Sequence, residues 1–77
     1  MKLLQKYTDE KISKMIFKRR QALCFTMRQA AEYCTMSQTC YRDYESGEKS
    51  LYSARPYTIA RVCRFLQIKP DELFEKS

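Results

Sequence analysis

Hydrophobic residues first recur at helical spacing in the N-terminal third of the chain. One apolar face is formed by Ile12, Met15, Ile16 and Leu23, and basic side chains fall largely between these positions. Thr8 precedes this stretch and can cap a helix N-terminus, and Asp9 and Glu10 would lie in the first turn. The pattern predicts a helix over about 9–23.

A second helical pattern lies in the C-terminal third. Its apolar stripe follows the i, i+3, i+4, i+7 spacing of a half-buried helix and consists of Ile59, Val62, Cys63 and Leu66. Pro56 suits the first position of this helix, because its missing N–H has no partner there anyway. Pro70 predicts the start of a further helix in the same way, with Leu73 and Phe74 as its anchors in the core.

Two short helices are expected between these patterns. Thr26 and Gln29 have the spacing of a capping box, which predicts a helix over about 27–34 with small inward residues. Ser37 is a second N-cap candidate, so a helix over about 38–46 follows after a tight turn, with Tyr41 and Tyr44 facing the core. Gly47 is expected to end it in the left-handed conformation.

Length and composition agree with a small helical protein. A chain of 77 residues has room for one domain, and a single Gly with two Pro is too little turn punctuation for an all-β fold. We therefore expect an all-α fold, a compact bundle of five helices. Residues 1–8 are expected to form a basic N-terminal lead-in to a single domain over 9–77.

Charge narrows the choice of partner. Fifteen Lys and Arg against nine Asp and Glu give a formal net charge of +6, which favours nucleic acid or an acidic membrane surface. No apolar run approaches the length of a membrane span, and the first residues lack the continuous apolar region of a signal peptide. A cytoplasmic protein is expected.

The chemistry of an enzyme or a metal site is not evident. The four cysteines, Cys24, Cys34, Cys40 and Cys63, lack the C-x-x-C spacing of zinc knuckles, and the chain has no His. Disulfides would need an oxidising compartment, so the cysteines are interpreted as core or boundary residues. A single Gly excludes a phosphate-binding Walker loop. We expect no metal, no cofactor and no catalysis.

The two short helices expected over 27–34 and 38–46 are joined by a short turn, and the first of them has small inward residues. This is the arrangement of a helix-turn-helix. The segment from Arg20 to Phe74 resembles the phage-repressor (Cro/XRE-type) DNA-binding family. The resemblance rests on Arg20, Phe25-Thr26, Ala31, Met36-Ser37, Tyr41, Glu45, Gly47, the stretch 62–68 and the stretch 71–74. Arg20 and Glu45 occupy positions that pair in the family, which implies a partly buried salt bridge between the first and third helices.

This resemblance implies that the helix over 37–46 enters the major groove of double-stranded DNA. Base contacts are then expected from Gln38, Thr39, Arg42 and Asp43. Gln38 suits adenine and Arg42 suits guanine, but Arg42 could equally contact phosphate or only solvent, and Asp43 is more typical of a surface acid. Phosphate contacts are expected from Met27 (through its backbone amide), Arg28, Ser37, Lys49 and Arg55.

Three departures from the family pattern stand out. Thr35 replaces the turn glycine, and a β-branched residue at positive φ is unfavourable, so a different turn geometry is expected. Met27 replaces the Gln that opens the second helix in many relatives, and so offers no side-chain hydrogen bond to phosphate. The loop after Gly47 is longer than is usual in the family.

The leading hypothesis is a sequence-specific, repressor-like transcriptional regulator acting as a homodimer on a palindromic site. Dimerisation is expected through the last helix and the apolar residues Phe65, Ile68 and Phe74, taken as exposed. The alternative is a protein-interaction module on the same fold, antitoxin-like or an adaptor, with little DNA binding. A basic amphipathic membrane binder ranks third, because the first helix needs its apolar face for the core.

Overall fold

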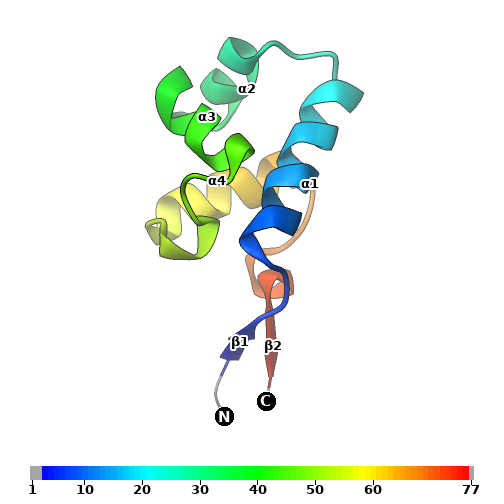
Figure 1. Ribbon diagram of the computed structural model, residues 1–77, viewed down its shortest axis with the longest axis vertical. Helices are drawn as coiled ribbons and strands as arrows, with labels where there is room; N and C mark the ends of the chain where they lie inside the picture. The colour runs from blue at the N-terminus through cyan, green and yellow to red at the C-terminus, as the bar shows by residue number, and fades with distance from the viewer. Residues whose placement is uncertain (1–2, 77) are drawn as a thin grey trace.

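The computed structural model of the protein describes residues 3–76, and four α-helices dominate them (Figure 1). The helices are α1 (Asp9–Ala22), α2 (Met27–Tyr33), α3 (Gln38–Ser46) and α4 (Pro56–Leu66). Two short 3₁₀ helices, η1 (Leu51–Ser53) and η2 (Pro70–Leu73), flank α4, and a two-stranded sheet joins β1 (Leu3–Gln5) to β2 (Phe74–Lys76). Residues 1–2 of the expected lead-in and residue 77 lie outside the described residues.

Side-chain caps fix where the first three helices begin, as the sequence predicts. The Thr8 hydroxyl accepts a hydrogen bond from the Lys11 amide, and the Ser37 hydroxyl accepts one from the Cys40 amide. Thr26 and Gln29 form the complete capping box, with both reciprocal hydrogen bonds present. Each cap satisfies an amide that has no partner inside its helix, so these starts are encoded locally.

Left-handed residues end the helices. Gly47 ends α3 with φ 86°, as expected, but Cys24, Thr35 and Gln67 end α1, α2 and α4 with φ near 60° although they carry side chains. The expectation of another turn geometry at Thr35 is therefore wrong. In a left-handed helix end, the residue after the left-handed one turns back onto the helix and commonly makes an apolar contact with it.

The residues that follow these three helix ends explain the strained conformation. The amides of Phe25, Met36 and Ile68 donate to the carbonyls of Arg20, Ala31 and Cys63, which completes a Schellman motif each time. All three of these side chains are partly buried against the core. Burial of the hydrophobic residue thus stabilises a left-handed conformation at its non-glycine neighbour.

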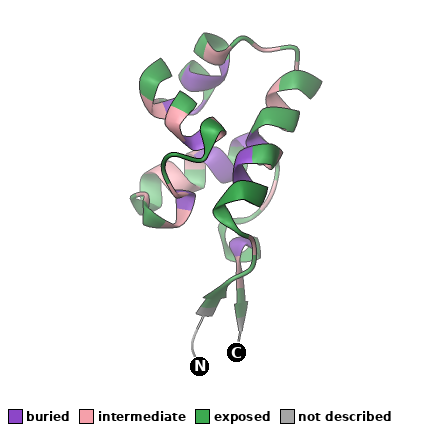
Figure 2. Cartoon of the chain, viewed as in Figure 1, coloured by how far each residue is buried: buried purple, intermediate pink, exposed green. Residues whose placement is uncertain are grey.

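The core lies where α1, α2, α3 and α4 meet (Figure 2). Small residues, Ala30 and Ala31, are fully enclosed in α2 and allow α3 to approach closely. Larger side chains fill the centre, among them Ile12, Ile16, Tyr41 and Phe65. A further tether runs from the Arg19 Nε to the Phe65 carbonyl, at 2.9 Å, and joins α1 to the end of α4.

The C-terminal segment corrects the predicted fold class. A fifth α-helix from Pro70 is absent from the described residues, because the chain forms only η2 and then turns extended as β2. β2 pairs antiparallel with β1, in a register that sets Gln5 opposite Phe74. The expected all-α bundle of five helices is therefore four α-helices with a small sheet, and part of the expected lead-in is β1.

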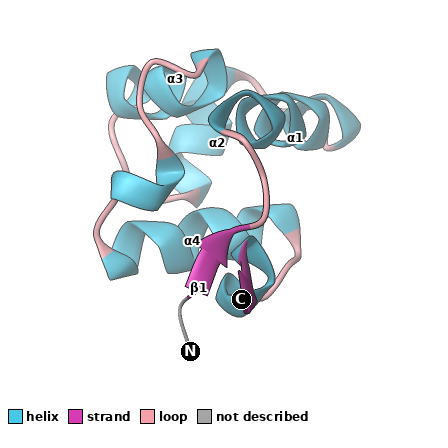
Figure 3. Ribbon diagram, turned by 60° about the horizontal axis from the view of Figure 1, so that its bottom comes forward, coloured by secondary structure: helices cyan, strands magenta, loops and turns pink. Residues whose placement is uncertain are grey.

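Long-range hydrogen bonds explain why η2 does not continue. The Leu73 carbonyl, which a longer helix would use for its own ladder, accepts from the Lys6 amide at 2.9 Å and from the Tyr52 hydroxyl at 2.8 Å. The Leu73 side chain is completely buried, so the chain is held at this point. Figures 1 and 3 both place the strands at the end of the molecule away from α2 and α3.

The expected dimer surface also needs correction. Phe65 is only 1% exposed, and its ring packs edge-on to Tyr41 with centroids 6.2 Å apart. Ile68 and Phe74 are partly buried against the core rather than exposed. α4 buries Phe65 in addition to its predicted apolar stripe, because α1 and η2 both pack against this helix. No helix within residues 3–76 is long and apolar enough to cross a membrane.

Candidate nucleic-acid interface

α2, a four-residue turn and α3 form a helix-turn-helix. The turn runs over 34–37, and the two helices pack directly against each other. Within the turn, Cys34 is buried in the core, and the partly buried Met36 side chain packs against the same core. This packing sets one face of α3 against the core and leaves the opposite face open to solvent.

The open face of α3 carries three of the four side chains predicted to contact bases. Gln38, Thr39 and Arg42 are exposed, whereas Tyr41 and Tyr44 on the other face are buried. Gln38 and Thr39 lie in the first turn of α3, and Arg42 lies about one turn further along the same face. Their amide, hydroxyl and guanidinium groups are all of types that recognise base edges.

Asp43 differs from these three residues. Its side chain is 17% exposed, and its carboxylate lies 3.6 Å from the Lys49 ammonium. The Lys49 amide also donates to the Asp43 carbonyl at 3.1 Å. The segment after α3 thus folds back onto Asp43 and partly neutralises it. Lys49 was predicted to contact phosphate, and in the structure its ammonium group already forms an ion pair with the Asp43 carboxylate.

Three of the four other predicted phosphate contacts lie at the starts of α2 and α3, and the fourth lies at the start of α4. Arg28 is exposed and lies 3.4 Å from Glu32 one turn on, in a solvent-exposed ion pair. Ser37 is exposed, but its hydroxyl already caps α3. Met27 is the first residue of α2, and its side chain is half-buried against the core. The group that Met27 offers to a phosphate is therefore its backbone amide. Arg55 is exposed at the start of α4, well separated from α2 in the chain.

A salt bridge locks α1 to α3 behind this surface. Arg20 Nε lies 2.8 Å from Glu45 Oε2, and a second guanidinium nitrogen donates to Oε1 at 2.9 Å. The Glu45 side chain is only 6% exposed and that of Arg20 17%, so the pair expected at these positions is present and mostly buried. Arg20 also donates to the Phe25 carbonyl at 3.1 Å. The bidentate geometry fixes the orientation of α3 relative to α1.

Electrostatic effects of burial are strongest behind α3. The hydrogen bond to Glu45 raises the pKa of Arg20, although desolvation opposes this shift. Burial, together with the Glu45 carboxylate, raises the pKa of Tyr41, whose hydroxyl has no hydrogen-bond partner within residues 3–76. Tyr41 is therefore neutral and contributes packing rather than charge to the core.

The cysteines divide into two pairs by exposure. Cys34 and Cys63 are buried, and burial raises the pKa of each thiol to about 11. Cys24 is exposed at the end of α1, and Cys40 is half-buried on α3. All four are free thiols, and residues 3–76 contain no cluster of three His, Cys, Asp or Glu side chains that could hold a metal ion.

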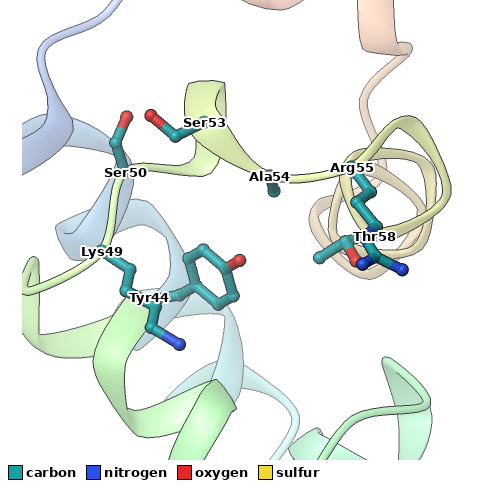
Figure 4. Close-up of a pocket in the computed structure, with 7 residues that line it drawn as sticks. All are labelled: Tyr44, Lys49, Ser50, Ser53, Ala54, Arg55 and Thr58. Atoms are coloured by element: carbon teal, nitrogen blue, oxygen red, sulfur yellow. The ribbon is translucent and has the colours of Figure 1, made fainter.

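A pocket of about 500 Å³ beside the interface was not predicted from the sequence (Figure 4). It lies between the end of α3, the segment 49–55 and the start of α4, and Tyr44, Lys49 and Arg55 are among its lining residues. Three sequence features point to this region: the long loop after Gly47, and Lys49 and Arg55, which were predicted to contact phosphate. Tyr44 and Arg55 line one pocket only because that loop folds between them, and the spacing of residues in the sequence does not reveal this.

Comparison with known proteins gives a fold and no family. No protein-family model matches the sequence, and no curated protein matches it in sequence. Among solved structures, the chain is similar to the clp gene regulator ClgR from Corynebacterium glutamicum. The TM-score is 0.66 at 20% sequence identity, over 91% of this chain and 71% of that one. The helix-turn-helix fold is thereby shared with a gene regulator.

Proposed function

We propose that this protein is a sequence-specific, double-stranded DNA-binding regulator of transcription, with α3 as the helix that enters the major groove. The observation that carries the proposal is the outward face of α3, where Gln38, Thr39 and Arg42 are exposed together at the start of the second helix of a helix-turn-helix. The shared fold with the gene regulator ClgR supports it.

Each of these side chains has a role in the proposal. Gln38 pairs bidentately with adenine, Arg42 with guanine, and Thr39 offers its methyl group to thymine. Asp43 contributes least, because Lys49 is already its partner at 3.6 Å. The backbone amides of Met27 and Arg28 at the start of α2, with the Arg28, Ser37, Lys49 and Arg55 side chains, contact phosphates and set the register.

The protein acts without a cofactor and without catalysis in this proposal, as a repressor-like homodimer in the cytoplasm. A single short recognition helix covers few base pairs, and two-fold pairing on a palindromic site doubles the contacts. The formal net charge of +6 supports an anionic partner, since cations on the protein release counterions from the duplex.

The first test is binding to a labelled random duplex by fluorescence anisotropy, at about 50 and 200 mM salt. We expect affinity in the micromolar range that falls steeply with salt, because non-specific binding is carried by phosphate contacts. An operator is then selected from a randomised duplex pool. Weak binding that salt does not change would contradict the proposal.

Single substitutions then separate base recognition from phosphate binding. We expect Gln38→Ala or Arg42→Ala to weaken binding to the selected operator by about 1–3 kcal/mol, and binding to random duplex much less. Arg64→Ala is the matched control, because it removes one exposed arginine from α4, away from the interface. Equal losses on operator and random duplex would show that both residues contact only phosphates.

A protein-interaction module is the second candidate, and exposed aromatic side chains favour it. Phe17 on α1 is 39% exposed, Tyr33 at the end of α2 is 46% exposed, and Tyr57 on α4 is 57% exposed. Aromatic residues are enriched at protein interfaces. This candidate predicts that Gln38→Ala and Arg42→Ala leave partner binding intact, unless the partner covers α3.

A further inference from the structure

The solvent side of α4 carries side chains at the i, i+3, i+4, i+7 spacing of a single helix face. These residues form the outer face of α4 and are Tyr57, Ala60, Arg61 and Arg64. Arg61 is half-buried, and the other three are exposed. In Figure 3, α4 runs along the side of the molecule opposite α3. The outer face is therefore a different surface from the open face of α3.

The Arg61 side chain is held in place on this face by Tyr57. A terminal guanidinium nitrogen of Arg61 donates to the Tyr57 hydroxyl at 2.9 Å, and the guanidinium carbon lies 5.0 Å from the centre of the Tyr57 ring. Tyr57 itself is 57% exposed. An arginine that is already ordered loses less side-chain entropy when a partner binds, so this pair is prepared for an intermolecular contact.

The charge of the outer face has no counterpart within the chain. α4 contains no Asp or Glu, and neither Arg61 nor Arg64 forms an ion pair with any residue of 3–76. Arg28 and Lys49, by contrast, each have a carboxylate partner in the same chain. Guanidinium groups bind carboxylates with two parallel hydrogen bonds. The surface that complements the outer face is therefore acidic.

The apolar part of this surface favours a protein helix over nucleic acid. Ala60 is small and exposed between longer side chains, which lets a second helix approach α4 closely. Tyr33, at the end of α2, is 46% exposed and extends the surface, because its ring packs 5.6 Å from that of Phe65, one turn after Arg61. Tyr and Arg are enriched at the centres of protein interfaces, whereas a phosphate backbone offers little apolar surface to tyrosine rings.

We propose that the outer face of α4, together with Tyr33, docks an acidic amphipathic helix of a partner protein. Carboxylates of that helix pair with Arg61 and Arg64, and its apolar side chains pack on Ala60 and on the rings of Tyr33 and Tyr57. The proposal does not depend on base recognition by α3. If the protein binds no duplex, the proposed regulator function is lost, and docking of the acidic helix is unaffected.

Titration of the protein with a synthetic peptide, followed by amide NMR shifts, tests the outer face directly. The probe is a helical peptide of about 15 residues with Glu and Leu along one side. The control peptide has Gln in place of every Glu. We expect saturable shifts at Tyr57, Ala60, Arg61 and Arg64 with the acidic peptide, and much weaker binding of the control. Binding of the acidic peptide should weaken between about 50 and 200 mM salt, because exposed charges are screened.

Substitutions separate this surface from the proposed DNA interface. Arg64→Ala should weaken binding of the acidic peptide about tenfold, because it removes one bidentate partner of a carboxylate. Ala60→Glu should abolish it, because a longer side chain with the same charge as the peptide then stands in the path of the helix. Arg42→Ala is the matched control, since it removes an exposed arginine from α3. It should reduce operator binding and leave peptide binding unchanged, whereas Arg64→Ala should do the reverse.

The proposal is overturned if the acidic peptide produces no saturable shift on the outer face. Equal binding of the Glu and Gln peptides would also overturn it, because carboxylates would then not be recognised. If Arg42→Ala and Arg64→Ala weaken peptide binding equally, the effect is one of net charge and the outer face is not a site. If a random duplex shifts the outer face and Arg64→Ala weakens duplex binding, the surface belongs to nucleic acid instead.

Discussion

The helical body and the strands at the two chain ends are stabilised differently. In the body, α1 to α4 bury a continuous core in which Ile16, Tyr41 and Phe65 are each 1% exposed. The β1–β2 pair has strands of three residues each, and Leu4 on β1 is 45% exposed. A two-stranded sheet this small is marginal on its own in water, so the pair depends on its attachment to the body.

The Tyr52 hydroxyl is the main attachment. It accepts from the Tyr7 amide at 3.2 Å and donates to the Leu73 carbonyl at 2.8 Å, so one atom bridges the two chain ends. The Tyr52 ring also packs edge-on to Phe74, with centroids 5.5 Å apart. Stability of the body is thus distributed over many contacts, whereas that of the strands is concentrated in a few.

The largest expected effect comes from the buried ion pair in the body. We expect Glu45→Ala to lower the free energy of unfolding by about 3–5 kcal/mol, because it leaves the Arg20 guanidinium largely buried and uncompensated. Thermal and urea denaturation measure the loss. Glu32→Ala is the control, since its ion pair with Arg28 is exposed and contributes at most about 1 kcal/mol. An unchanged melting temperature in Glu45→Ala would show that the Arg20–Glu45 bridge does not stabilise the fold.

A smaller effect of opposite sign is expected at the end of α2. Thr35→Gly should raise the free energy of unfolding by about 1 kcal/mol, because a β-branched residue at φ 58° is strained and glycine is not. Urea denaturation of Thr35→Ala gives the comparison, since alanine retains a Cβ and should gain much less. A Thr35→Gly variant less stable than the Thr35→Ala variant would show that the threonine side chain itself stabilises the turn.

An effect of similar size, centred on the chain ends, distinguishes the strands from the body. Tyr52→Phe should lower the free energy of unfolding by about 1 kcal/mol while hydrogen exchange at Lys6 and Tyr7 becomes much faster. Hydrogen exchange of amides at the centre of α1 should become faster only as much as the lower global free energy of unfolding requires. Tyr33→Phe is the matched control, because Tyr33 is exposed and its hydroxyl has no partner in the described structure. Uniform acceleration over the whole chain would show that the strands and the body unfold as one unit.

Local signals predicted the helical body well. Thr8, Thr26 and Ser37 each cap the helix that follows, and Gly47 and Pro56 stand at the predicted helix end and start. These features act within a few residues, so spacing alone reveals them. The exposed face of α3 followed from the same periodicity, because burial of Tyr41 and Tyr44 determines which side faces solvent. The Arg20–Glu45 pair was expected only from the family resemblance.

The sequence by itself determined where the four α-helices begin and which faces they bury, because caps and periodicity are local. Tertiary structure alone decided that the stretch after Pro70 ends as β2, since its partner β1 lies near the other end of the chain. It also decided the left-handed turn at Thr35, which burial of Met36 stabilises, and the meeting of Tyr44 with Arg55 in one pocket. These features depend on contacts between distant segments, whose free energy exceeds the local preference of any single residue.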